Sequence, residues 1–101
     1  MQSKFNAYGS GFGITFANGY YVSVQFGIAN YCENNGLIDV RFEDWGEEQT
    51  NCGLKGCKNA ECAVFDPSGE MIEMDGWGDT VKGYMTVEEV FELFEKVKEL
   101  K

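Results

Sequence analysis

The strongest constraint on the fold is a regular alternation of apolar residues over positions 12–26, interrupted in the middle by Asn18-Gly19. Alternation with a period of two on both sides of an Asn-Gly pair is typical of a β-hairpin. One face of this hairpin is therefore apolar and is expected to lie on the core. The residues of that face are Phe12, Ile14, Phe16, Tyr20, Val22, Val24 and Phe26.

The length of the hairpin loop decides the register of the two strands. A two-residue loop would put the two apolar sets on opposite faces, because directly opposed residues share a face. A three-residue loop, residues 17–19, pairs Ile14 with Val22 and keeps both sets together. We therefore predict this loop, with Gly19 in the left-handed conformation of a G1 bulge.

The opposite face of the hairpin is small and mildly polar, and it is a candidate binding face. Glycine at position 13 would let a ligand or partner approach the backbone closely. Plain exposure to solvent is the other interpretation, and the sequence leaves both open. The candidate residues are Thr15, Tyr21, Ser23 and Gln25.

Residues 61–74 predict a second hairpin around Asp66-Pro67-Ser68-Gly69, which suits a type I turn with a bulge. With residues 67–69 as the loop, Val64 faces Ile72 and Cys62 faces Met74 on one apolar face. Phe65 and Met71 pair on the other face. Cys62 is then expected to be a thiol of the core.

Between the hairpins, residues 37–43 alternate apolar Ile38, Val40 and Phe42 with charged residues, which predicts a middle strand. Residues 43–48 and the loop that carries Cys52 and Cys57 are expected to be irregular and exposed.

The C-terminal segment predicts a helix from residue 87 to about residue 100. Thr86 and Glu89 form a capping-box pattern, and Met85 and Val90 have the spacing of a hydrophobic staple. An apolar stripe follows at helical spacing and is expected to cover one face of the sheet. The stripe consists of Val87, Val90, Phe91, Phe94, Val97 and Leu100.

These elements predict a single domain over residues 1–101 with an α+β fold. An antiparallel sheet of about five strands, made of two hairpins and a middle strand, packs on one C-terminal helix. At this length the chain is large enough for one hydrophobic core and too short for two.

The net charge of −9, from 17 acidic and 8 basic residues, limits the possible functions. A nucleic-acid binder normally presents a basic face to phosphates, so we expect no direct nucleic-acid binding. Histidine is missing from the whole sequence, which excludes Ser-His-Asp and Cys-His catalysis. We therefore expect a protein that is not an enzyme and needs no cofactor.

Four cysteines, Cys32, Cys52, Cys57 and Cys62, raise the question of a zinc site. The last three are evenly spaced, but paired CxxC knuckles are missing and the predicted register turns Cys62 inward. We predict reduced thiols and no bound metal. No segment is apolar over a length that would span a bilayer, and no signal segment precedes the hairpin, so we expect an intracellular protein without a membrane contact.

The acidic segment around Trp45 is the first candidate for a partner-binding site. An aromatic side chain surrounded by charge has the composition of an interface anchor that meets a basic surface. Packing of Trp45 at the edge of the core is the other interpretation. The candidate residues are Glu43, Asp44, Trp45, Glu47 and Glu48.

Residues 11–27 (GFGITFANGYYVSVQFG), continued by Asn30-Tyr31-Cys32, resemble the opening of small uncharacterised proteins of tailed phages and prophages. Residues 63–66 and 79–84, followed by the capped helix, are similar to their later segments. The cysteine-bearing loop over residues 50–61 departs from the resemblance, and no catalytic residue carries over.

This resemblance implies a phage-encoded protein in the host cytoplasm. Small acidic phage proteins without enzymatic machinery often bind and block a host protein, including proteins of anti-phage defence. We therefore expect a non-enzymatic inhibitor of a host protein with a basic surface. The alternative is a small-molecule binding module, such as a sponge for a nucleotide signal. The sequence leaves the oligomeric state open.

Overall fold

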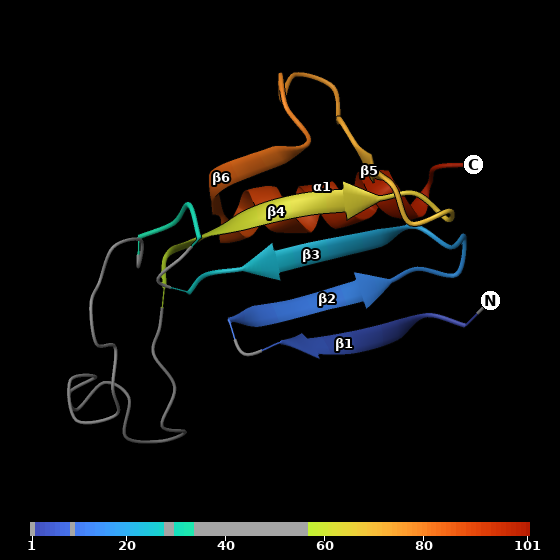
Figure 1. Cartoon of the computed structure of the whole chain (residues 1–101), viewed down its shortest axis with the longest axis horizontal. Helices are drawn as coiled ribbons and strands as arrows, with labels where there is room; N and C mark the ends of the chain where they lie inside the picture. Colours follow the sequence, from blue (N-terminus) through green and yellow to red (C-terminus); the bar gives the residue numbers. More distant parts are fainter. Residues whose placement is uncertain (1, 9, 28–29, 34–56) are drawn as a thin grey trace.

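The computed structural model describes residues 2–8, 10–27, 30–33 and 57–101, which form one antiparallel sheet and one helix (Figure 1). This is the predicted α+β fold. The strands of the described part are β1 (Lys4–Tyr8), β2 (Gly11–Thr15), β3 (Tyr21–Gln25), β4 (Asn59–Phe65), β5 (Met71–Ile72) and β6 (Val81–Thr86), and the helix is α1 (Val87–Lys98).

The strand order follows the chain from β1 to β4, and β5 and β6 both pair with β4. Each of these pairings is antiparallel. β4 is therefore the strand that joins the N-terminal half of the sheet to the C-terminal half. β1 lies at the outer edge of the N-terminal half (Figure 1).

The predicted register of the first hairpin is confirmed. Ile14 pairs with Val22, and the loop is closed by a hydrogen bond of 2.8 Å from the Phe16 amide to the Tyr20 carbonyl. Gly19 has a φ of 91°, the left-handed conformation that the bulge requires and that glycine adopts at low cost.

The second hairpin is confirmed near its turn and wrong at its far end. Val64 pairs with Ile72 and Phe65 with Met71, as the pattern predicts. β5 then ends at Ile72, so the expected pairing of Cys62 with Met74 does not form. Cys62 instead pairs with Lys82 of β6, because β6 takes over the same edge of β4.

Two strands were not expected from the sequence. β1 has only a weak apolar alternation in its sequence, and it is identified as a strand by its pairing with β2. β6 contains a register shift, with Ala60 opposite Met85 but Cys62 opposite Lys82, and Tyr84 in the shifted stretch has a φ of 54°. Such a bulge breaks the alternation on which recognition of a strand depends. The predicted middle strand, residues 37–43, lies outside the described residues.

The capping box of α1 is confirmed at its N-terminus. The Thr86 hydroxyl accepts a hydrogen bond of 3.2 Å from the Glu89 amide, and the Glu89 carboxylate accepts one of 2.8 Å from the Thr86 amide. Met85 and Val90, the expected staple, are both buried in the core. The helix ends at Lys98, two residues before the expected end.

Asn18 of the first hairpin loop caps the other end of α1. Its Nδ2 donates hydrogen bonds of 2.9 Å to the carbonyls of Val97 and Leu100, while its Oδ1 accepts from the Tyr20 amide at 3.0 Å. Val97 lies in the last turn of α1, where carbonyls lack a full set of partners within the helix, and Leu100 follows the helix end. A residue expected only to form a turn therefore also attaches the helix to the sheet.

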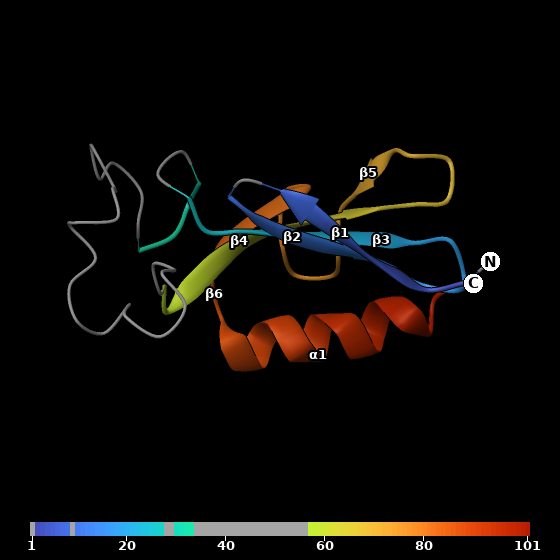
Figure 2. The same cartoon turned by 90° about the horizontal axis from the view of Figure 1, so that it is seen from below.

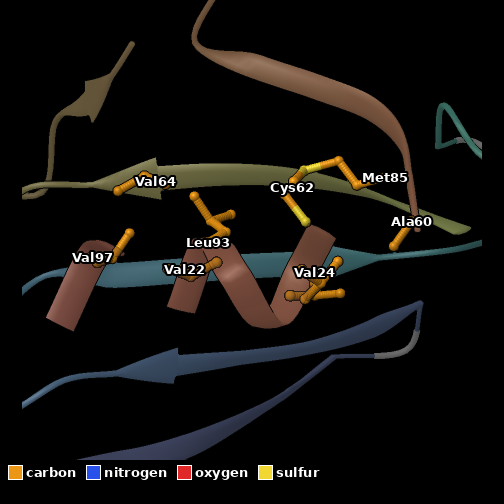
Figure 3. Packing of buried hydrophobic residues seen from close by; sticks show 9 residues of the cluster. Val22, Val24, Ala60, Cys62, Val64, Met85, Leu93 and Val97 are labelled. Carbon is orange, nitrogen blue, oxygen red and sulfur yellow. The ribbon is translucent and has the colours of Figure 1, made fainter. Parts of the chain in front are cut away.

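α1 covers one face of the sheet and packs on β3, β4 and β6 (Figure 2). Val22, Val64 and Val97 are completely buried between helix and sheet, as Figure 3 shows. The remaining buried members of this core are Val24, Ala60, Cys62, Met85, Val90 and Leu93.

The predicted apolar stripe of α1 is correct at Val90, Phe94, Val97 and Leu100 and wrong at two positions. Val87 and Phe91 are 51% and 63% exposed, whereas Leu93, which was not assigned to the stripe, is buried. Phe94 is half-buried and packs edge to face on Phe16, with 6.0 Å between the ring centroids. The sequence cannot show which part of a wide apolar face the sheet covers.

α1 has 12 residues, and no helix in the described ranges has the length and apolar composition that crossing a membrane requires.

The helix packing predicts a contrast between two substitutions. Leu93→Ala should lower the free energy of unfolding by about 2–5 kcal/mol, because it leaves a cavity in the core. Phe91→Ala should cost less than about 1 kcal/mol, because the ring is mostly in water. Urea unfolding followed by circular dichroism measures both. Equal losses would mean that α1 is rotated relative to the described packing.

The C-terminal cap of α1 predicts that Asn18→Asp destabilises the protein. The carboxylate keeps the acceptor for the Tyr20 amide but replaces two donated hydrogen bonds with repulsion from helix carbonyls. We expect a loss of about 1–3 kcal/mol in the free energy of unfolding. Asn18→Ala is the matched variant, which removes the same hydrogen bonds without adding a charge. If Asn18→Asp were as stable as the wild type, the capping role of Asn18 would be contradicted.

Candidate functional site

The face of the sheet away from α1 carries the predicted alternative binding residues. Thr15 opposes Tyr21, and Ser23 and Gln25 follow Tyr21 at alternate positions of β3, so all four side chains share this face. The register of β3 with β4 extends the face to Phe65, Ala63 and Glu61. We call this surface the outer face.

Tyr21 occupies the space above Gly13 on the outer face. A Cβ atom at position 13 would overlap the Tyr21 ring, which also packs against Phe65 with 5.5 Å between the ring centroids. The close approach that glycine permits here is thus made by a side chain of the protein itself. This part of the outer face is packed, and it does not provide an open approach for a ligand.

A hydrogen-bonded cluster lies at the other end of the outer face, centred on Gln25. The Gln25 Oε1 accepts from the Ser10 hydroxyl at 2.9 Å and from Asn30 Nδ2 at 3.3 Å. Its Nε2 donates to the Ser23 hydroxyl at 3.0 Å. We call Ser10, Ser23, Gln25, Asn30 and Glu61 the polar network.

Asn30 links the polar network to the loop that follows β3. Its Nδ2 donates to the Glu61 carboxylate at 3.1 Å, and its Oδ1 accepts from the Gly27 amide at 2.8 Å. The next residue, Tyr31, accepts a hydrogen bond of 2.8 Å at its carbonyl from the Tyr84 amide of β6. The segment Asn30-Tyr31-Cys32 therefore joins β3, β4 and β6.

The sequence did not single out Ser10, Asn30 or Glu61 as site residues. For Asn30 the signal was the expected resemblance to phage proteins, which stays a prediction. Glu61 carried none, since its place beside Gln25 depends on the pairing of β3 with β4, two strands separated by more than 30 residues. Pairing at this separation is not readable from local patterns.

A shallow depression of about 170 Å³ lies on the outer face. It is smaller than the roughly 300–1,000 Å³ of sites that enclose a small-molecule ligand. Its size suits a single side chain of a partner better than a nucleotide, and the Glu61 carboxylate beside it is suited to accept hydrogen bonds. The lining residues are Ser23, Gln25, Glu61, Cys62, Ala63, Phe65, Met71 and Val81.

The acidic segment predicted as the first partner-binding site, Glu43, Asp44, Trp45, Glu47 and Glu48, lies outside the described residues. Its role stays a prediction.

Two described carboxylates have structural roles. Hydrogen bonds from Ser68 and from the backbone of the turn hold the pKa of Asp66 below its usual value. Hydrogen bonds with Thr86 in the capping box likewise lower the pKa of Glu89. Both groups are fully ionised near neutral pH and stabilise a turn and a helix end, so neither has the raised pKa of a general acid.

The described cysteines lie in different environments. Cys32 and Cys62 are buried and Cys57 is half-buried. Over residues 2–8, 10–27, 30–33 and 57–101, no three cysteine or carboxylate side chains come together as a metal site would require. Cys52 lies outside the described residues, so the metal-free state stays a prediction.

Cys62 is the residue whose ionisation is most strongly suppressed by the fold. Burial in the core, and to a lesser extent the Glu61 carboxylate, raises the pKa of its thiol from 9.0 to about 12. A thiol in this state is a poor nucleophile at neutral pH. Its position in the core agrees with the expectation from the second hairpin.

No protein-family model matches this chain, and no curated protein or solved structure matches it either.

The buried thiol predicts a loss of stability at high pH. In the unfolded chain Cys62 ionises near pH 9, whereas in the folded protein it keeps its proton to about pH 12. The folded state therefore binds more protons above pH 9, and the contribution of this group to stability falls as the pH rises toward 12. Cys62→Ala should remove this component, measured as the free energy of unfolding against pH. Cys57→Ala is the matched control, and an identical pH profile for wild type and Cys62→Ala would contradict the prediction.

Proposed function

We propose that this protein is a non-enzymatic, phage-encoded inhibitor that binds a basic surface of a host protein and blocks it. The observation that carries the proposal is the uneven distribution of charge along the chain. Residues 1–32 contain no aspartate or glutamate, and all 17 acidic residues follow them. The strands β1, β2 and β3 are thus free of carboxylates, and the negative charge is concentrated in the rest of the molecule.

This distribution supports recognition of a protein rather than simple solubility. Carboxylates gathered on one part of a surface create a directed potential, which accelerates the encounter with a basic partner. In the described part, residues 70–79 contribute four exposed carboxylates and no basic side chain: Glu70, Glu73, Asp75 and Asp79. The acidic segment at residues 43–48 adds four more around Trp45.

The resemblance to phage proteins supports the biological setting of the proposal. A host target with a basic surface includes proteins of anti-phage defence that bind nucleic acids, because such proteins present cationic surfaces. An acidic protein that occupies such a surface competes with the phosphate backbone.

The small-molecule alternative has less support from the geometry. The depression on the outer face is too small to enclose a nucleotide, and its neighbour Glu61 would repel phosphate groups. Native mass spectrometry of protein purified from cells distinguishes the two functions. A co-purifying protein supports the inhibitor, and a retained small molecule supports the alternative.

The inhibitor proposal predicts how partner binding depends on salt and on charge. Surface-plasmon kinetics against the co-purifying protein should show an association rate that falls about tenfold or more as salt is raised well above 0.1 M, with a smaller effect on dissociation. Replacing Glu43, Asp44, Glu47 and Glu48 with lysine should abolish binding while leaving the melting temperature nearly unchanged, because the sequence predicts an exposed segment here and exposed charges contribute little to stability. Trp45→Ala should accelerate dissociation and cost about 2 kcal/mol or more of binding free energy if it is the anchor.

The matched control replaces Glu70, Glu73, Asp75 and Asp79 with lysine, which changes the net charge by the same amount at another place. Binding that survives this change but not the first would localise the site to residues 43–48. Binding indifferent to salt and to both variants would contradict the electrostatic proposal and make the outer face, with Thr15, Tyr21, Ser23 and Gln25, the first candidate.

A further inference from the structure

Within the described part of the chain, β1 forms an open edge of the sheet. It is last in the strand order and pairs with β2 on one side, and no strand of the described part pairs with its other side. An open edge is a template for pairing with another strand. Natural edge strands usually carry charges, prolines or bulges that prevent such pairing, but β1 has regular pairing with β2 and a single charged residue, Lys4, at its first position.

Next to this edge, the apolar face of the sheet continues beyond the helix. Phe5 opposes Ile14 and Ala7 opposes Phe12, so these side chains lie on the face that α1 covers farther along the sheet. α1 packs on β3, β4 and β6 and does not reach β1 (Figures 1 and 2). Phe5 is 82% exposed, more than any other large hydrophobic residue in the described ranges.

The charge distribution identifies the partner that this edge can accept. Two copies of a chain with a net charge of −9 repel each other over most of their surfaces. Residues 1–32 contain no carboxylate, and Lys4 is their only charged side chain. The β1 edge is therefore a place where a second copy can approach without bringing carboxylates together.

We propose that two copies of this protein pair through β1, antiparallel and about a two-fold axis, to form one continuous sheet. Such an interface is self-complementary, since the same strand serves on both sides. With the axis at Asn6, Phe5 lies opposite the partner's Ala7, so a large side chain meets a small one. Phe5 and the partner's Phe5 become diagonal neighbours on the same face, within reach of an aromatic contact.

The self-association is tested first by sedimentation equilibrium of the full chain. The wild type should show a concentration-dependent mass that rises from 11.3 kDa to twice that value. A mass of 11.3 kDa at every concentration would overturn the proposal, and so would growth beyond the dimer, because pairing of β1 about a two-fold axis closes the assembly.

Phe5→Glu locates the interface. It places a carboxylate on each side of the two-fold axis and should raise the dimer dissociation constant about tenfold or more. Phe5 is exposed and contributes little to the core, and an unchanged circular dichroism melting curve excludes unfolding as the cause. Met71→Glu, an exposed apolar residue of β5 with the same change in charge, is the matched control and should leave the dimer intact. A dimer that survives Phe5→Glu, or is lost in Met71→Glu, would overturn the proposal.

Disulfide trapping tests the register independently of affinity. Opposed residues of an antiparallel pair have Cβ atoms about 4.5–5.5 Å apart, so Asn6→Cys should form a cross-linked dimer under mild oxidation. Lys4→Cys should not, because its two copies would be about four residues apart along the strands, far beyond the reach of a disulfide. Wild type under the same oxidant accounts for the native thiols. Cross-linking of Lys4→Cys but not of Asn6→Cys would overturn the register.

Salt dependence separates this proposal from the proposed function. Salt screens the repulsion between two copies of net charge −9, so the dimer should become tighter as salt rises. Binding of a basic partner should become weaker under the same change. If the dimer dissociated at high salt, the proposed pairing through the uncharged β1 edge would be contradicted. This conclusion does not depend on the result for partner binding.

Discussion

The described structure depends on the packing of α1 against β3, β4 and β6. Val22 of β3, Val64 of β4 and Val97 of α1 have no exposed surface and belong to the core between helix and sheet (Figure 3). Burial of apolar side chains is the main favourable contribution to folding. Asn18 adds a directional contact, since from the loop of the first hairpin it donates to the carbonyls of Val97, in the last turn of α1, and of Leu100, just after it. Together these contacts set which face of the sheet is covered and how far the helix reaches.

On the outer face, side chains of the described residues stabilise the sheet. The Tyr21 ring lies over Gly13, and the polar network satisfies buried amide and hydroxyl groups through Asn30. A buried polar group without a partner would cost free energy, so these hydrogen bonds permit Ser23 to be buried in β3. Asn30, which follows β3 in the chain, thus has a structural role.

The two proposals use different parts of an unevenly charged molecule. Association with a basic partner is attributed to the carboxylates that follow residue 32, and association with a second copy is attributed to the neutral edge before it. Rising salt should strengthen the association of two copies and weaken the binding of a basic partner. The two interactions can therefore be distinguished by measuring each affinity across a salt series. If both occur, one dimer would present two acidic surfaces, and binding to a target with two sites would gain from multivalency.

The sequence by itself determined the local elements of this protein. Period-two alternation with Asn-Gly and Pro-Ser-Gly turns specified both hairpins and the pairing of Ile14 with Val22, because neighbouring residues interact through short loops. Side chains within one helical turn likewise specified the capping box. Tertiary structure alone decided that β6 displaces Met74 from its expected place opposite Cys62, that Leu93 rather than Phe91 faces the core, and that Glu61 joins Gln25. These outcomes depend on contacts between residues far apart in the chain, whose geometry is set when the elements pack and not by the pattern of any single segment.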